Sequence, residues 1–417
     1  MRDPDTAMVA DTAERGGAAS ELQTLVVVSA AHLVSHFYIL VLPVLLPLLK
    51  ERLGVGFFEL GLAITTFNIV SGLTQAPMGF VVDRLGARGV LIAGLALGGV
   101  AFAMFGVLTS YPWLIAAAIL AGLANCVYHP ADYAILSQSI ADDRIGRAFS
   151  VHTFAGFLGG AIAPPILLGL VAFGGLPAAL TFAGLLGPAV AVGLLLMPRP
   201  QAADGARSLR ADTGAGGSSL AGVLTPAILS LTGFFVLIAL ANSAINSFSV
   251  VALIASQGMS LIGANAALTA FLACAALGVL VGGALADRTP RHGEVAALGF
   301  GLTALIVLAV GTLSLPGLVI VSAMGLAGFL SGMIMPSRDM LVRKAAPPGS
   351  AGRAFGIVST GFNIGGIIGP LLFGWIMDQA SPSWVFGGAV VFMALGGGVA
   401  LASGRRRPRA PLPQPAE

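Results

Sequence analysis

The sequence predicts an all-α integral membrane protein, in which twelve transmembrane helices form two pseudo-symmetric halves of six. Composition is the first reason: 57% of the 417 residues are hydrophobic and only 9% are charged, whereas a typical soluble domain carries roughly 25% charged residues. A repeat is the second: residues 79–84 resemble residues 283–288, and Asp287 follows Asp83 by 204 positions (287 − 83). So long a period suits a duplicated helical bundle whose halves lie side by side in the membrane.

The individual helices are predicted from apolar runs of roughly 20 residues, the length that crosses a bilayer core of about 30 Å. Strands are not expected, because an open sheet in lipid would leave backbone groups unpaired. The run at 224–254 is long enough to contain extra helix beyond the span. In chain order the predicted spans are 25–49, 58–82, 89–109, 112–138, 147–171, 175–197, 224–254, 261–286, 294–314, 317–341, 353–377 and 383–403.

Polar segments divide the chain into domains. Residues 1–22 have mixed charge and no apolar core, so they are expected to form a disordered cytoplasmic tail and do not resemble a cleaved signal. Residues 198–223 are rich in Pro, Gly, Ser and Ala, as in a flexible cytoplasmic linker. The six-helix bundles are then 23–197 and 224–404, and 405–417 form a second cytoplasmic tail.

The basic residues predict the orientation. With both termini in the cytoplasm, 19 of the 21 Lys and Arg residues fall on the cytoplasmic side, and only Lys50 and Arg52 face outside. This is the bias of the positive-inside rule. Because the basic residues are dispersed over short loops, membrane lipid is an expected partner and nucleic acid is not.

Enzyme chemistry is not expected. The sequence has no Gly-x-x-x-x-Gly-Lys nucleotide loop and no extended soluble domain. Cys126 and Cys274 both lie in apolar runs, where cysteine packs as a small hydrophobic residue. No cofactor, metal or disulfide is therefore predicted, and the chain is expected to be a monomer.

The loop after the second predicted span carries a family resemblance. It reads Gly79-x-x-x-Asp83-Arg84-x-Gly86-x-Arg88, with a weaker echo at 283–291. Together with the twelve spans, the duplication and the long central loop, this resembles the major facilitator superfamily over essentially the whole chain. The resemblance implies a secondary transporter whose two bundles rock about a central cavity.

A narrower resemblance is carried by two segments. Residues 32–38, followed by Pro43 and Pro47, and residues 125–130 are similar to the branch that contains fosmidomycin-resistance-type drug exporters. That branch implies a proton-coupled antiporter for efflux in the bacterial cytoplasmic (inner) membrane. Ala118, however, stands where antiporters of the superfamily carry an arginine. Export is therefore favoured by the branch and not by diagnostic residues.

The loop at 79–88 has a physical role of its own. Asp83 can accept hydrogen bonds from the unpaired amides at a helix N-terminus, and Gly79 lets a neighbouring helix approach. In the superfamily such a loop resembles a latch that favours the outward-open form, with Asp83 here facing residues 352–354. A tight turn with a solvated ion pair is the alternative. The latch candidates are Gly79, Asp83, Arg84, Gly86, Arg88, Asp287 and Arg288.

Polar side chains inside the predicted spans are candidates for coupling and substrate binding. His32 and His36 share a face of the first span, and Asn125, His129 and Asp132 share a face of the fourth. Ionisable groups at membrane depth normally face a cavity or a partner, so Asp132, His129 and His36 are the candidates for proton coupling.

Alternatives remain for these groups. Asp132 can instead belong to an ion-pair network with the charged loop at 142–147, and a buried histidine can simply pack with one hydrogen bond. His152 is a weaker candidate for cavity lining. Histidines also suit transition metals, but no carboxylate or thiolate cluster is recognisable beside them, so metal transport is not expected.

The second half adds further cavity candidates. Arg338 holds the position equivalent to Asp132, 206 residues later (338 − 132). It can pair with Asp132 in one state of the protein or bind an anionic substrate. The full set of substrate-cavity candidates is His32, His36, Asn125, His129, Asn242, Asn246, Asn363 and Arg338.

Three functions stay open on the sequence. The first is a proton-driven exporter of a small organic compound, and the second is an uptake permease for an organic anion. The third is a non-transporting member that serves as a sensor or assembly protein.

Overall fold

The computed structural model describes residues 4–107, 110–141, 144–197, 224–347 and 350–405. Within these ranges all regular structure is helical. The helices of the first half are α1 (Pro4–Leu53), α2 (Phe57–Leu85), α3 (Ala87–Gly106), α4 (Tyr111–Ser139) and α5 (Ile145–Leu196).

Helix α5 contains two spans. Its 52 residues are interrupted at Gly174 and Gly175, and Gly175 has a φ of 69°, which glycine adopts without steric cost. Eleven helices of the described chain are long and apolar enough to cross a membrane when α5 is counted once. The break in α5 supplies the twelfth span, so the prediction of separate spans at 147–171 and 175–197 is confirmed.

The second half begins with a composite helix. Its parts are α7 (Pro226–Ser243), the π-helix η1 (Ala244–Phe248) and α8 (Ser249–Gln257), and together they fill the long predicted run at 224–254. The remaining helices are α9 (Leu261–Arg288), α10 (His292–Thr312), α11 (Gly317–Ala345), α12 (Ala351–Gln379) and α13 (Trp384–Arg405).

The chain ends differ in part from the composition-based expectation. Helix α1 starts at Pro4 and so runs through most of the segment 1–22 for which a disordered tail is expected. Five of the 22 residues of this segment are Ala, the strongest helix former, and this outweighs its lack of an apolar core. The expected linker 198–223 and residues 406–417 lie outside the described chain.

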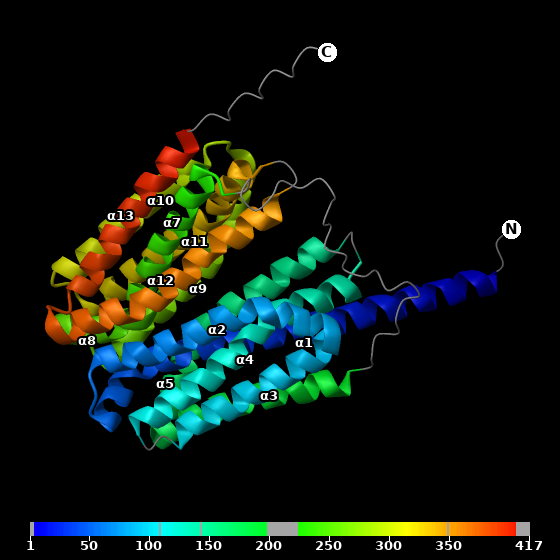
Figure 1. Ribbon diagram of the computed structural model, residues 1–417, viewed down its shortest axis with the longest axis horizontal. Helices are drawn as coiled ribbons and strands as arrows, with labels where there is room; N and C mark the ends of the chain where they lie inside the picture. The colour runs from blue at the N-terminus through cyan, green and yellow to red at the C-terminus, as the bar shows by residue number, and fades with distance from the viewer. Residues whose placement is uncertain (1–3, 108–109, 142–143, 198–223, 348–349, 406–417) are drawn as a thin grey trace, which may run out of the picture.

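The two halves meet at one end and spread apart toward the other. In Figure 1 helices α1–α5 form one group and α7–α13 the other, and the groups converge near α8 and diverge toward the ends marked N and C. The halves contact each other mainly along α2 and α12 and between α5 and α9.

The packing of α2 on α12 is close. A Cβ atom on Gly61 would lie 2.2 Å from the carbonyl oxygen of Pro370, so only glycine permits this approach. Two helical turns further on, the side-chain amide of Asn68 donates to the carbonyl oxygen of Gly366 over 2.7 Å. Small residues and polar cross-links of this kind join helices in a membrane, where apolar burial contributes little.

Asp378, near the end of α12, closes this contact at the start of α2. Its two carboxylate oxygens accept hydrogen bonds from the backbone amides of Phe57 (3.0 Å) and Phe58 (2.7 Å). The Lys50 ammonium lies 3.5 Å from the same carboxylate. Asp378 therefore caps the exposed amides of α2 from the other half of the protein. We call Lys50, Phe57, Phe58 and Asp378 the Asp378 clasp.

Among the described residues, the opposite end of α2 shows no contact of this kind with the other half. Asp83 is exposed there, and a Cβ atom on Gly79 would meet nothing within 4 Å. The halves are thus joined at the end of α2 that follows Lys50 and separate at the end that carries the Asp83 loop.

Candidate functional site

Four histidines and an aspartate meet inside the first half. They are His32 and His36 of α1, His129 and Asp132 of α4, and His152 of α5, and we call them the histidine–aspartate cluster. The ring of His32 is central: its centroid lies 4.0 Å from that of His152, 4.7 Å from His36 and 5.2 Å from His129. The spacing of these residues predicts that they share one face of α1 and one face of α4. The structure packs these two faces against each other.

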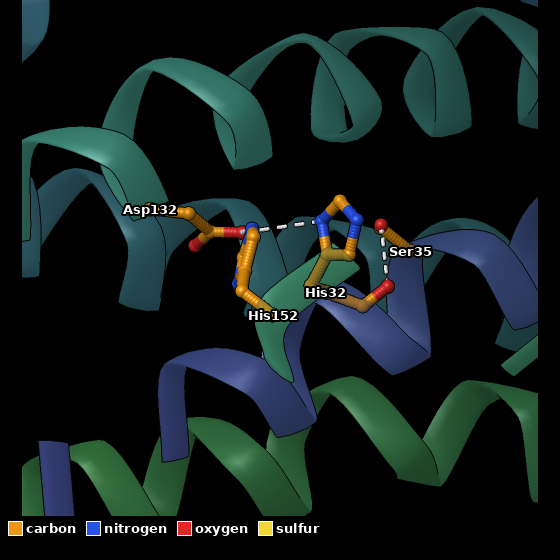
Figure 2. A network of polar contacts seen from close by, with 4 residues as sticks. All are labelled: His32, Ser35, Asp132 and His152. Atoms are coloured by element: carbon orange, nitrogen blue, oxygen red, sulfur yellow. Dashed lines mark hydrogen bonds and ion pairs between the residues drawn. The ribbon is translucent and has the colours of Figure 1, made fainter. Parts of the chain in front are cut away.

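Asp132 is fully buried beside two of these rings. One carboxylate oxygen, Oδ2, lies 3.6 Å from Nδ1 of His32 and 3.7 Å from Nε2 of His152. Figure 2 shows both rings next to this carboxylate, while Ser35 donates to the backbone carbonyl of His32 and stays out of the contact. Asp132 therefore lies with histidines of the bundle interior in this structure.

The polar atoms of this contact lack hydrogen bonds. Within the described chain, both oxygens of Asp132, Nδ1 of His32 and both ring nitrogens of His152 are buried without a hydrogen-bond partner. Buried polar groups are nearly always hydrogen-bonded, because leaving one unpaired costs free energy of the order of 1–3 kcal/mol. So many unpaired atoms at one point are typical of a site that binds a proton, an ion or a substrate.

Gly156 provides the space for the imidazole rings. A Cβ atom at this position would lie 2.6 Å from Cδ2 and Nε2 of His32 and 3.0 Å from Cδ2 of His36. Gly156 follows His152 by four residues and so shares its face of α5. From the sequence His152 is only a weaker candidate for cavity lining, and Gly156 is not among the candidates. The signal was a histidine one turn before a glycine-rich stretch.

The cluster becomes more accessible toward His36 and His129. Asp132, His32 and His152 are buried, whereas the side chains of His36 and His129 are only half-buried. His36 and His129 are therefore the members of the cluster that are most exposed to solvent.

The asparagine candidates differ in their surroundings. The side-chain amide of Asn125 donates to Oγ of Ser71 over 2.8 Å and so joins α4 to α2. Asn363 of α12 is exposed, and Asn242 is half-buried. Asn246 lies in the π-helix η1, and its Oδ1 is buried with no hydrogen-bond partner in the described chain. Because π-helical turns are frequent at functional sites, Asn246 is the best placed of the four for binding.

Arg338 does not contact Asp132 in this structure. Its Nε and Nη2 both lie 2.8 Å from Oδ1 of the adjacent Asp339. The guanidinium also sits over the rings of Phe235 and Phe362, at 4.9 and 5.3 Å from their centroids. Asp132 and Arg338 thus occupy equivalent positions on α4 and α11 of the two halves, but their charges do not pair.

The latch candidates are spread over the surface of the open end. Gly86 forms the turn between α2 and α3 with a φ of 86°, a conformation that favours glycine. The guanidinium of Arg88 donates to the carbonyl oxygens of Leu194 and Met197, and so ties the loop to the end of α5 in its own half. The remaining charged candidates are exposed: Asp83, Arg84, Asp287 and Arg288.

One expectation about metals needs correction. A ligand atom from each of His32, Asp132 and His152 lies within 4.8 Å of the others, so a carboxylate does accompany the histidines. The three positions come from three separate helices, and no spacing rule links them in the sequence. The sequence alone therefore does not reveal that these three side chains lie together.

Comparison with known proteins gives relatives that cover most of the chain. The fosmidomycin resistance protein of Escherichia coli (strain K12) is 24% identical over 370 residues, which cover 86% of this chain and 87% of that protein. The membrane sensor protein UhpC of the same organism is 26% identical over 360 residues, covering 82% of this chain and 81% of that protein. UhpC of Salmonella typhimurium matches over a similar length, at 28% identity over 82% of this chain and 81% of that protein. Three further curated matches cover only 30–34% of this chain and 27–34% of their own length.

The fold is shared with solved transporter structures. A bacterial homologue of the human lysosomal transporter Spinster, in an inward-facing and unoccupied conformation, superposes with a TM-score of 0.79 at 14% identity, over 93% of this chain and 97% of that one. The sequence profile described as Major Facilitator Superfamily matches residues 28–248 and 229–417. The chain is a multi-pass membrane transport protein that belongs to the major facilitator superfamily.

Proposed function

We propose that this protein is a secondary active transporter that exports a small organic compound across the bacterial cytoplasmic membrane in exchange for protons. The observation that carries the proposal is the buried carboxylate of Asp132, which lies beside two imidazoles without a hydrogen bond. Neither neighbour has a permanent charge, so this is not a fixed ion pair. A carboxyl group in such a place is suited to take up and release a proton during transport.

The contacts between the halves support a transport cycle of alternating access. The Asp378 clasp holds them together at one end, and the Asp83 loop is exposed at the other. With the orientation that the basic residues predict, the clasp faces the outside and the protein is open to the cytoplasm. We propose that the outward-open form releases the clasp and brings Asp83 to the start of α12, so that the two contacts alternate.

Export is supported by the likeness to the fosmidomycin resistance protein over 86% of the chain. The cluster in the first half would carry the proton, and the polar side chains Asn242, Asn246 and Asn363 of the second half would contact the substrate. No cofactor takes part in this scheme.

Two other functions, uptake of an organic anion and sensing without transport, would be supported by other results of the test below. Arg338 favours an uptake permease for an organic anion, although Asp339 already pairs with its charge. The likeness to the membrane sensor protein UhpC favours a sensor that does not transport.

Growth of an efflux-deficient bacterial host tests the proposal. The host expresses wild type, Asp132→Asn or the control Glu294→Gln at matched membrane levels, across toxic compounds that include fosmidomycin. Glu294 is an exposed residue of α10 outside the cluster. We expect wild type and Glu294→Gln to raise the inhibitory concentration of at least one compound, and Asp132→Asn to match the empty vector.

The other outcomes are informative in different ways. Equal protection by Asp132→Asn would remove this residue from coupling while leaving export intact. Greater sensitivity with the wild type would indicate uptake. If no compound gives a difference and purified protein in vesicles moves none of them, the sensor function gains support.

A further inference from the structure

We propose that His32, Asp132 and His152 form a binding site for one divalent transition-metal ion. Three helices of the first half each provide one ligand: α1, α4 and α5. The proposal concerns binding only, and it does not depend on the direction of transport or on the organic substrate.

The distances are close to those of a metal site. Zinc binds imidazole nitrogen at about 2.0–2.1 Å and carboxylate oxygen at about 2.0–2.2 Å, which places neighbouring ligand atoms of a tetrahedral site roughly 3.4 Å apart. In the cluster, Oδ2 of Asp132 lies 3.6 Å from Nδ1 of His32 and 3.7 Å from Nε2 of His152. All three ligand atoms lie within 4.8 Å of one another. Small side-chain movements are enough to surround an ion.

The unpaired polar atoms are an independent argument. The same atoms that face one another are buried, and each lacks a hydrogen-bond partner within the described chain. A bound cation would satisfy all three at once and would balance the charge of the Asp132 carboxylate. A network that only held helices together would instead show short hydrogen bonds among these groups.

The donor set selects the kind of ion. Two imidazoles and one carboxylate suit zinc, cobalt, nickel or ferrous iron, whereas magnesium and calcium prefer oxygen ligands alone. Three protein ligands also leave coordination positions for water or for a further imidazole. His36 and His129 flank the site and are half-buried, so they provide both a route of entry and candidates for a fourth ligand.

Metal titration of the purified full-length protein tests the site. The protein is purified in detergent through an affinity tag without histidine, and Co²⁺ is added while its visible absorption bands are recorded. We expect one Co²⁺ per chain with the intense bands of a four- or five-coordinate site, and displacement of Co²⁺ by Zn²⁺. Calorimetry with Zn²⁺ gives the dissociation constant.

Variants separate the site from adventitious binding. His32→Ala, His152→Ala and Asp132→Asn should each weaken Zn²⁺ binding by more than about tenfold, since even residues that only orient a metal ligand change affinity 10- to 100-fold. His292→Ala is the matched control, because His292 is the fifth histidine of the chain and lies at the start of α10, outside the cluster. Its variant should bind like the wild type.

Two results would overturn the proposal: no stoichiometric Co²⁺ or Zn²⁺ binding by the wild type, or wild-type affinity in all three cluster variants. Size-exclusion profiles identify variants that fail to fold, and His152→Gln, which keeps a polar side chain of similar size, replaces His152→Ala in that case. Because binding is measured without transport, failure of the metal site would leave the export proposal standing. Absence of export by the wild type would likewise leave the metal-binding proposal standing.

Discussion

Gly156 shows how one small residue determines the geometry of the cluster. Its missing side chain leaves room for the ring of His32, whose centroid also lies 4.0 Å from that of His152, 4.7 Å from His36 and 5.2 Å from His129. The ring therefore has little freedom to move away from an added methyl group. Interiors respond to a single inserted carbon by shifting side chains or backbone, at a cost of about 1–3 kcal/mol.

We expect Gly156→Ala to disturb the cluster, and Gly160→Ala to be tolerated. A Cβ atom at Gly160 would meet only a methyl group of Leu40 at 3.6 Å, which is an ordinary contact. Gly156→Ala should lower the thermal stability of the purified protein and, under the export proposal, abolish any drug resistance conferred by the wild type. Wild-type melting temperature and resistance in Gly156→Ala would contradict the packing described here. The Gly160 variant controls for helix propensity.

The residues of the cluster were predictable only in part. Helical spacing places His32 with His36 and Asn125 with His129 and Asp132, because residues three and four apart share a face. The place of His152 in the cluster was not predictable, because spacing within one helix does not indicate which face of α5 meets α1 and α4. The pairing of Arg338 with Asp339 was likewise unforeseen, because a neighbour in sequence competes with a partner in space.

At the scale of the helices, the Asp378 clasp is the main polar contact between the ends of the two halves. It joins α12 to the start of α2 across 321 residues of sequence. Nothing in the sequence near Asp378 indicates this partner, because the pairing depends on how the halves are placed. The break in α5 was predictable, since two apolar runs separated by Gly174 and Gly175 are too long for one crossing.

Removing the charge of Asp378 should favour the other conformation. Loss of a helix cap costs about 1 kcal/mol, and a free energy of that size shifts an equilibrium about fivefold. We expect Asp378→Asn to lower the population of the described state, as read from distances between spin labels at Glu51 and Ser381, both exposed at this end. The two native cysteines, Cys126 and Cys274, would first be replaced.

Lys50→Met provides a graded comparison. The Lys50 side chain is 41% exposed and its ammonium lies 3.5 Å from Asp378, and exposed ion pairs of this kind contribute little. The distance distribution of Lys50→Met should therefore stay close to that of the wild type. An effect of Lys50→Met as large as that of Asp378→Asn would show that charge pairing, and not capping of α2, holds the clasp.

At the scale of the whole molecule, orientation determines which way the open end faces. The number of spans and the duplication were predictable from the apolar runs, because lipid admits few alternatives to long helices. The conformational state was not predictable from the sequence, because the inward-open and outward-open forms contain the same helices. Only contacts such as Gly61 with Pro370 distinguish one from the other.

Reporter fusions should confirm that both termini are cytoplasmic. Green fluorescent protein fused after residue 417 should fluoresce, and alkaline phosphatase at the same point should be inactive, because the first folds in the cytoplasm and the second outside it. A phosphatase inserted after Gly54, in the turn between α1 and α2, should be active. The reverse pattern would invert the membrane orientation and make the described state outward-open.

The histidine–aspartate cluster is confined to the first half, since all five of its residues come from α1, α4 and α5. When one rigid half tilts against the other, distances within the cluster stay the same and only the reservoir it faces changes. Its intrinsic affinity for a proton is then similar on both sides of the membrane. If the protein exchanges its substrate for protons as proposed, the gradients decide the direction of net movement. Transport should then run backwards when the proton gradient is reversed.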